Sequence, residues 1–93
     1  MGYEWDAENA DAHFKKHGVS FERGSHIFEN PVFQREDDRI AYGEPRIIAL
    51  GESDGGVLVV VYTQRGDNRR IISVRKASPD ERELYYSAVR HLE

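Results

Sequence analysis

The 93-residue chain is long enough for one domain and too short for two, so we expect a single domain over residues 1–93. Its hydrophobic fraction of 39% suits a small folded protein, and the lack of cysteine excludes disulfides, thiolate zinc sites and a cysteine nucleophile. The formal net charge of -4 argues against bulk attraction to nucleic acid, and the lack of a long apolar run or signal-peptide pattern predicts a soluble cytoplasmic protein without membrane contact.

The first expected elements are an extended start at "YEWD" and a helix over residues 7–17. Asp6 is suited to cap this helix through its carboxylate, and Gly18 ends it with a residue that accepts the left-handed conformation. The packing face predicted from helical spacing consists of Ala7, Ala10, Phe14 and His17.

A second short helix is expected over "FERGSHIFEN", residues 21–30, between a Ser20 cap and Pro31. Its predicted apolar contacts are Phe21, Ile27 and Phe28. The following stretch predicts a short strand at residues 32–34 and then a solvated acidic turn. That turn consists of Glu36, Asp37 and Asp38, and a bare acidic run does not show the arrangement of oxygens that a hard cation needs.

Three strands are predicted at residues 46–52, 57–65 and 69–76, separated by the turn sequences "SDGG" and "GDN". This spacing predicts an antiparallel meander with the most apolar strand at its centre. Ser78, Pro79 and Glu81 form a capping box for a C-terminal helix. Its predicted apolar stripe is Leu84, Tyr85, Ala88 and Leu92, and the fold class is α+β.

Positive charge gathers on the predicted strands although the whole chain is acidic. Residues 64–76 hold one acid, Asp67, and five basic residues: Arg65, Arg69, Arg70, Arg75 and Lys76. A local anion site is therefore compatible with the acidic total.

Side-chain alternation places Thr63 and Arg65 on one face of the middle strand, and Ser73 and Arg75 on one face of the last. A loop of about three residues centred on "GDN" is expected to bring both pairs into one patch, provided that the register holds. The opposite face is expected to pack under helices through Tyr62, Ile72 and Val74.

Two arginines on one face need an anion between them. A phosphate matches the fork of a guanidinium, and a carboxylate such as that of Glu81 or Glu83, or one from a partner protein, serves equally well. The spacing leaves both alternatives open.

The segments "EWD", "KHGVSFE", "GEPR", "VVVYTQR", "RIISVRKAS" and "DERELYY", in this order, resemble the BrnT family of type II toxins, the ribonuclease partners of BrnA antitoxins. The resemblance spans roughly residues 3–86. It implies a RelE-like fold with two N-terminal helices, an antiparallel sheet and a C-terminal helix. It also implies RNA cleavage that inhibits translation, without a cofactor.

The same resemblance implies a hetero-oligomer with a BrnA-like antitoxin that carries a ribbon-helix-helix domain. The complex would repress its own operon and contact operator DNA only through the antitoxin. The sequence departs from the family in having Asn9 and His13 where relatives commonly carry Lys and Asn. The kept positions, onto which the resemblance carries a catalytic role, are Lys16, His17, Arg65 and Arg75.

Metal-free RNA cleavage needs a base, cations on the phosphate and an acid. Arg65 and Arg75 suit the cationic role because they are always charged. His17 suits acid–base chemistry, or it packs beside a C-capping glycine. Lys16 either holds RNA or complements the helix dipole.

The candidate RNA-binding residues are Trp5, Thr63, Ser73, Arg69, Arg70 and Lys76. Trp5 either stacks on a base or packs in the core, and the two hydroxyls either bind phosphate or pair across strands. The four-residue spacing of His13 and His17 lacks the glutamate of a zinc-protease helix, so no metal is expected. The alternative function is a non-catalytic binding module, or an inactivated relative, that acts only as co-repressor.

Overall fold

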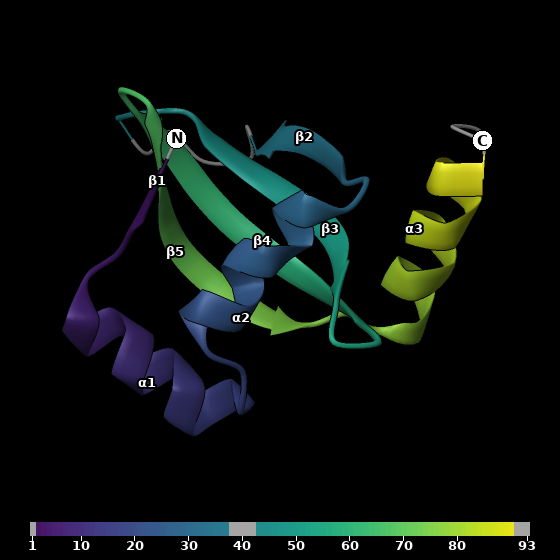
Figure 1. The fold of residues 1–93 in the computed structure, drawn as a ribbon, viewed down its shortest axis with the longest axis horizontal. Coiled ribbons are helices and arrows are strands. Elements are labelled where there is room, and N and C mark those ends of the chain that lie inside the picture. The colour runs from purple at the N-terminus through teal and green to yellow at the C-terminus, as the bar shows by residue number, and fades with distance from the viewer. Residues whose placement is uncertain (1, 38–42, 91–93) are drawn as a thin grey trace.

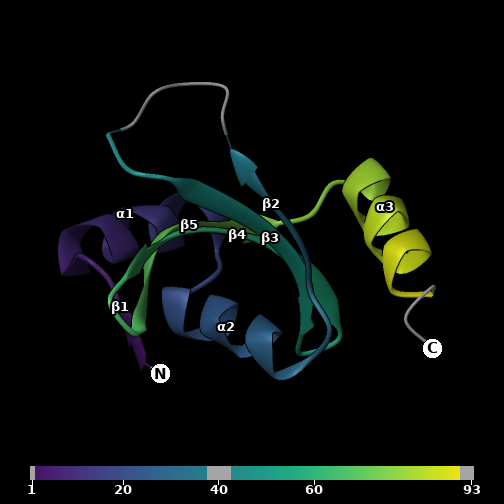
Figure 2. The ribbon, with the colours of Figure 1, turned by 90° about the horizontal axis from the view of Figure 1, so that it is seen from above.

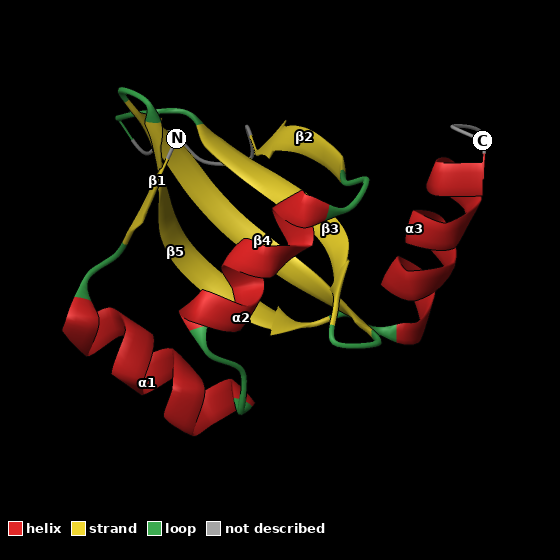
Figure 3. Cartoon of the chain, viewed as in Figure 1, coloured by secondary structure: helices red, strands yellow, loops and turns green. Residues whose placement is uncertain are grey.

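The computed structural model describes residues 2–37 and 43–90, and these fold into a curved five-stranded sheet with helices on both sides (Figures 1 and 3). No helix within these ranges has the length and hydrophobicity needed to cross a membrane. In chain order the elements are β1 (Gly2–Glu4), α1 (Ala7–His17), α2 (Phe21–Ser25), the 3-10 helix η1 (His26–Glu29), β2 (Phe33–Asp37), β3 (Arg46–Ser53), β4 (Gly56–Arg65), β5 (Asn68–Lys76) and α3 (Pro79–Arg90). The predicted α+β class is confirmed.

Local signals define both N-terminal helices. The Asp6 carboxylate accepts a hydrogen bond from the Asn9 amide at 3.0 Å, and Gly18 ends α1 at φ 72° while its amide donates to the Phe14 carbonyl at 2.8 Å. The Ser20 hydroxyl accepts from the Arg23 amide at 3.0 Å, as a cap of α2 should. The helix predicted to residue 30 is α2 followed by η1.

The strand order is β1-β5-β4-β3-β2, and the predicted antiparallel meander is its centre. β1 lies at the predicted extended start and adds a parallel edge beside β5, a pairing that the sequence pattern did not indicate. The predicted solvated turn is wrong for Glu36 and Asp37, because both extend β2, and Asp37 pairs with Arg46 and is only 8% exposed. Asp38 lies outside the described residues.

A β-bulge interrupts the pairing of β4 with β5. Val61 pairs with Ser73, but its neighbour Tyr62 pairs with Ile71, so Ile72 is the extra residue. The prediction that Ile72 packs under the helices is therefore wrong, and Ile71 takes that place. The Asn9 side chain donates to the Ile72 carbonyl at 2.9 Å, so α1 is bonded to the bulge.

The sheet separates two apolar clusters (Figure 2). α2 lies within the hollow of the curved sheet and α3 lies on its outer side. The cluster on the α2 side comprises Val19, Phe21, Ile27, Ala49, Leu58, Val60, Tyr62, Ile71 and Val74. The smaller cluster on the α3 side comprises Leu50, Val57, Val59, Ala77 and Tyr85.

Two predicted helix faces need correction. Phe14 is 53% exposed because α1 packs beside β5 through Ala10, while the ring of His13 turns toward Phe21. On α3, Leu84 is 50% exposed, and Tyr85 is the buried residue whose hydroxyl donates to the Pro31 carbonyl at 2.8 Å. Leu92 lies outside the described residues.

Gly24 lets α2 approach the sheet closely, since a Cβ there would lie 2.6 Å from Cγ2 of Val74. We expect Gly24→Ala to lower the free energy of unfolding by about 1–3 kcal/mol through overpacking, although alanine is the better helix former. Chemical denaturation measures the change, with the exposed Glu22→Ala as control in the same helix. An unchanged or raised stability for Gly24→Ala would contradict this close packing.

Candidate functional site

The register of β4 and β5 places five candidate residues on one side of the sheet. Thr63 pairs with Arg70, Val61 with Ser73, Val59 with Arg75, and Arg65 with Asn68, all at alternate positions of β4. These positions lie on the α3 side, together with the cluster that contains Val59. We call this set the arginine face: Thr63, Arg65, Arg70, Ser73 and Arg75.

The arginine face does not form one compact patch. Arg65 lies beside the hairpin turn at Gly66 and Asp67, whereas Arg75 lies opposite Val59 near the other end of β4. At about 3.3 Å per residue, the Arg65 and Val59 positions are about 20 Å apart along the strand. The predicted convergence of Arg65 and Arg75 is therefore wrong, because the turn is tight and pairs the strands end to end.

Each arginine of this face binds a carboxylate from another segment. Arg65 donates to Glu44 through Nη2 at 3.0 Å and Nε at 3.3 Å. Arg70 donates to Glu4 at 3.4 Å. Arg75 donates to both oxygens of Glu81 at 2.7 and 2.8 Å. Of the two anions considered from the sequence, a phosphate or a carboxylate, the structure shows carboxylates beside all three arginines. One of them is Glu81, which the sequence analysis named.

The pair of Arg75 and Glu81 also organises the start of α3. The predicted capping box is present, since Glu81 accepts from the Ser78 amide at 2.8 Å and donates its own amide to the Ser78 hydroxyl at 3.2 Å. Hydrogen bonding from Arg75, followed by that from Ser78, lowers the pKa of Glu81 from 4.5 to about 2. Arg75 therefore fastens β5 to α3.

Arg65 is held differently. The side chains of Arg65 and Glu44 are 49% and 38% exposed, and hydrogen bonding to Arg65 lowers the pKa of Glu44. Ion pairs this exposed contribute little to stability and exchange readily. Thr63 is 1% exposed and donates its hydroxyl to the Pro45 carbonyl at 2.8 Å, so it holds the segment beside Glu44. Arg65 is thus the arginine best placed to exchange its carboxylate for another anion.

The two other catalytic candidates lie on α1, which packs beside β5. Lys16 is exposed, and the half-buried ring of His17 stacks on that of His13 with centroids 5.5 Å apart. Burial, followed by the charges of His17 and Lys16, lowers the pKa of His13. Within the described part of the chain, Nδ1 of His13 is buried and has no hydrogen-bond partner. His13 is therefore a titratable candidate that sequence reasoning considered only as a metal ligand.

The remaining candidate RNA contacts, Trp5, Arg69 and Lys76, lie on the α2 side of the sheet, opposite the arginine face. Trp5 packs edge-on against Phe21 with ring centroids 6.1 Å apart, which favours the core alternative. The guanidinium of Arg69 lies 4.0 Å from the centroid of Phe28 on the α2 side, and Lys76 is exposed at the end of β5. In the described ranges no cluster of three or more His, Asp or Glu could hold a metal ion.

Two basic residues near Lys76 carried no signal in the sequence. Arg23 of α2 and Arg82 of α3 line a cavity with Lys76, although Arg23 lies far from the other two along the chain. A pattern search in one segment misses such a group because only the fold brings it together.

The architecture, a mostly antiparallel sheet with N-terminal helices and a C-terminal helix, matches that of a solved ribonuclease toxin. The 1.1 Å crystal structure of the Brucella abortus ribonuclease toxin BrnT matches with a TM-score of 0.63 and 27% sequence identity, over 84% of this chain and 97% of that one. The model of the family described as ribonuclease toxin BrnT of type II toxin-antitoxin system matches residues 5–81. This chain belongs to the BrnT family. A search of curated proteins gave no match.

The lowered pKa of Glu81 predicts a specific acid sensitivity. The ionised carboxylate of Glu81 is favoured in the folded state. Its contribution to the free energy of unfolding is therefore complete above pH 4.5 and is lost as the pH falls toward about 2. We expect Glu81→Gln to be less stable than the unchanged chain at pH 6, with a shallower loss of stability below pH 4.5. Denaturant titrations from pH 6 to pH 2 measure both slopes.

The matched control is Glu83→Gln, an exposed position on the same helix. It should keep the steep loss of stability in acid. A Glu81→Gln curve parallel to that of the unchanged chain would refute the role given to the pair of Arg75 and Glu81.

Proposed function

We propose that this chain is an endoribonuclease that cleaves RNA without a metal ion and thereby inhibits translation. Membership of a ribonuclease toxin family supports the reaction class. The structural observation that carries the proposal is the position of Arg65: an always-charged, half-exposed group at the end of β4, paired with an exposed carboxylate that a phosphate can replace.

Metal-free cleavage of RNA requires attack of a ribose 2′-oxygen on the adjacent phosphorus and loss of the 5′-oxygen of the next nucleotide. A base takes the 2′ proton, a cation stabilises the charge on the phosphate oxygens, and an acid protonates the leaving oxygen. Arg65 suits the second role because its guanidinium pairs with two oxygens at once. His17 and the neighbouring His13 are the titratable candidates for base and acid, with Lys16 as an additional cation, but they lie on α1 toward the α2 side, so the structure does not bring them next to Arg65.

A toxin of a type II system is paired with an antitoxin. We assign this role to a BrnA-like protein with a ribbon-helix-helix domain, which neutralises the toxin in a hetero-oligomer in the cytoplasm. Toxin and antitoxin together repress the operon, and the toxin contacts operator DNA only through its partner.

A second candidate function is supported by the same ion pairs. Arg65, Arg70 and Arg75 are all neutralised by carboxylates of the chain itself. Asn9, where relatives commonly carry lysine, adds no charge and is bonded to the bulge. These observations favour a non-catalytic relative that acts as co-repressor only. Both functions include an antitoxin, so finding one does not separate them, whereas growth arrest on expression without antitoxin does.

Exchange of carboxylate for phosphate at Arg65 gives the main prediction. We expect Arg65→Ala to slow cleavage of a labelled single-stranded RNA in EDTA by about 10²–10³-fold, because a donor to the charged phosphate is lost. Glu44→Gln should cleave at least as fast as the unchanged chain, because it frees Arg65. Single-turnover cleavage by purified, antitoxin-free protein measures both rates.

Thermal melts establish that both variants are folded. If loss of the ion pair alone mattered, Arg65→Ala and Glu44→Gln would be impaired alike. A folded Arg65→Ala protein with full activity would show that Arg65 is not part of the site. Activity that disappears in EDTA and returns with Mg²⁺ would refute the metal-free mechanism.

A further inference from the structure

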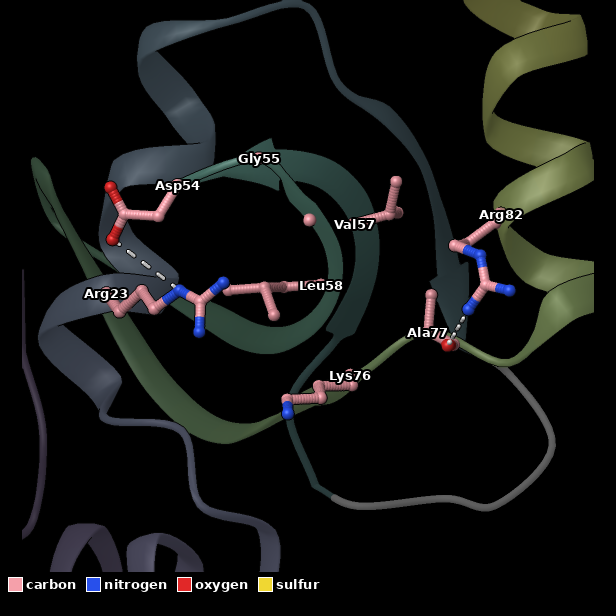
Figure 4. Close-up of a pocket in the computed structure, with 9 residues that line it drawn as sticks. Arg23, Asp54, Gly55, Val57, Leu58, Lys76, Ala77 and Arg82 are labelled. Carbon is pink, nitrogen blue, oxygen red and sulfur yellow. Dashed lines mark hydrogen bonds and ion pairs between the residues drawn. The ribbon is translucent and has the colours of Figure 1, made fainter.

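A cavity of about 330 Å³ lies at the end of the sheet where α2 and α3 approach from opposite sides (Figure 4). Its wall includes the turn between β3 and β4, the first residues of β4 and the last residue of β5. Arg23 enters from α2, Arg82 from α3 and Lys76 from β5. Three separate elements therefore contribute one cation each.

The charges around this cavity are not balanced by carboxylates. The side-chain ammonium of Lys76 has no ion-pair or hydrogen-bond partner among the described residues, and Arg82 donates to the neutral carbonyl of Ala77 at 3.3 Å. Asp54 is the acid in the cavity wall, and it lies 3.6 Å from Nε of Arg23 with its side chain 81% exposed. Three cations against one carboxylate leave an excess of two positive charges, in contrast to the neutralised arginine face.

Arg23 is already fixed in position. Its Nη2 donates to the Ser53 carbonyl at 3.1 Å, and the Ser53 hydroxyl donates back to the Arg23 carbonyl at 2.9 Å. Nε of Arg23 is buried and has no hydrogen-bond partner within the described residues. The guanidinium thus needs little reorganisation to meet an anion.

We propose that this cavity binds the sugar–phosphate backbone of single-stranded RNA, through Arg23, Lys76 and Arg82. The inference rests on the proposed action on RNA and names a second contact for that substrate. Lys76 follows Arg75 at the end of β5, so the cavity adjoins the end of the arginine face, while the Lys76 side chain itself points to the opposite side of the sheet. An RNA strand that extends beyond the arginine face at Arg75 therefore reaches the cavity next.

The cavity suits RNA better than an acidic protein segment. Its apolar wall, Val57, Leu58 and Ala77, offers contact to a ribose, while the cations around it meet phosphate oxygens. The volume is large enough for a sugar–phosphate unit. Lys and Arg bind a backbone without reading its sequence.

The test measures binding separately from cleavage. The probe is a fluorescent 2′-O-methyl oligoribonucleotide, which lacks the attacking hydroxyl, and anisotropy is recorded over a series of salt concentrations. We expect Lys76→Ala and Arg82→Ala each to bind about fivefold more weakly at 0.1 M salt, with a log–log salt slope shallower by about 0.7. Arg82→Lys should restore the slope, and Arg90→Ala, exposed on α3 outside the cavity, is the control.

Binding unchanged in both cavity variants, or an equal loss in Arg90→Ala, would overturn the inference. If the two cavity variants bind a hexaglutamate peptide more weakly than the unchanged chain does, but bind the RNA probe equally well, the RNA inference is overturned in favour of a protein ligand. Cleavage of unmodified RNA by the unchanged chain tests the proposed function itself. If the unchanged chain cleaves RNA but both cavity variants bind the probe normally, the proposed function stands and the cavity inference is refuted. If the unchanged chain does not cleave RNA but both variants bind the probe more weakly, the cavity inference is still supported.

Discussion

The pairing of β4 with β5 is the constraint on which the rest of the structure depends. Its register turns Val60, Tyr62 and Ile71 toward α2 and leaves the alternate positions for the arginine face. The bulge at Ile72 maintains this division along both strands, because without it every residue of β5 beyond that point would change sides. Asn9 bonds the bulged carbonyl, so α1 is tied to the same feature. A hairpin that forms the core thus also decides which charges can act together.

The same register explains why the arginines need carboxylates from distant segments. Arg65 and Arg75 lie at opposite ends of the hairpin, so no single anion bridges them. The segment before β3, β1 and α3 each supply an acid, and in doing so they fasten themselves to the sheet. The bidentate pair at α3 is part of a capping box and is structural. The pair of Arg65 and Glu44 is more exposed and caps no helix, so the two arginines have different structural settings although they look equivalent in sequence.

Local signals in the sequence predicted the elements well. The caps at Asp6, Ser20 and Ser78 form as expected, because each depends on residues within one turn. What failed depends on distant parts of the chain. Nothing within β5 indicates the bulge, and Asp37 is drawn into β2 by pairing with β3. The cavity was missed for the same reason, since Arg23 and Arg82 meet only through the packing of α2 and α3 around the sheet.

The net charge of -4 disfavours the proposed binding of RNA when only the total is considered, but the local arrangement of charges is different. At physiological ionic strength the screening length is about 8 Å, so acids on the far side of the domain have little influence on a phosphate at the surface. What a nearby phosphate experiences is the local balance: an excess of two positive charges at the cavity and, at Arg65, a cation held by an exchangeable acid. Three acids of residues 1–45 serve other tasks: Asp6 caps α1, and Glu44 and Glu4 pair with Arg65 and Arg70. An acidic total is therefore compatible with RNA binding, provided that the substrate contacts the end of the β4–β5 hairpin and the cavity rather than the surface at large.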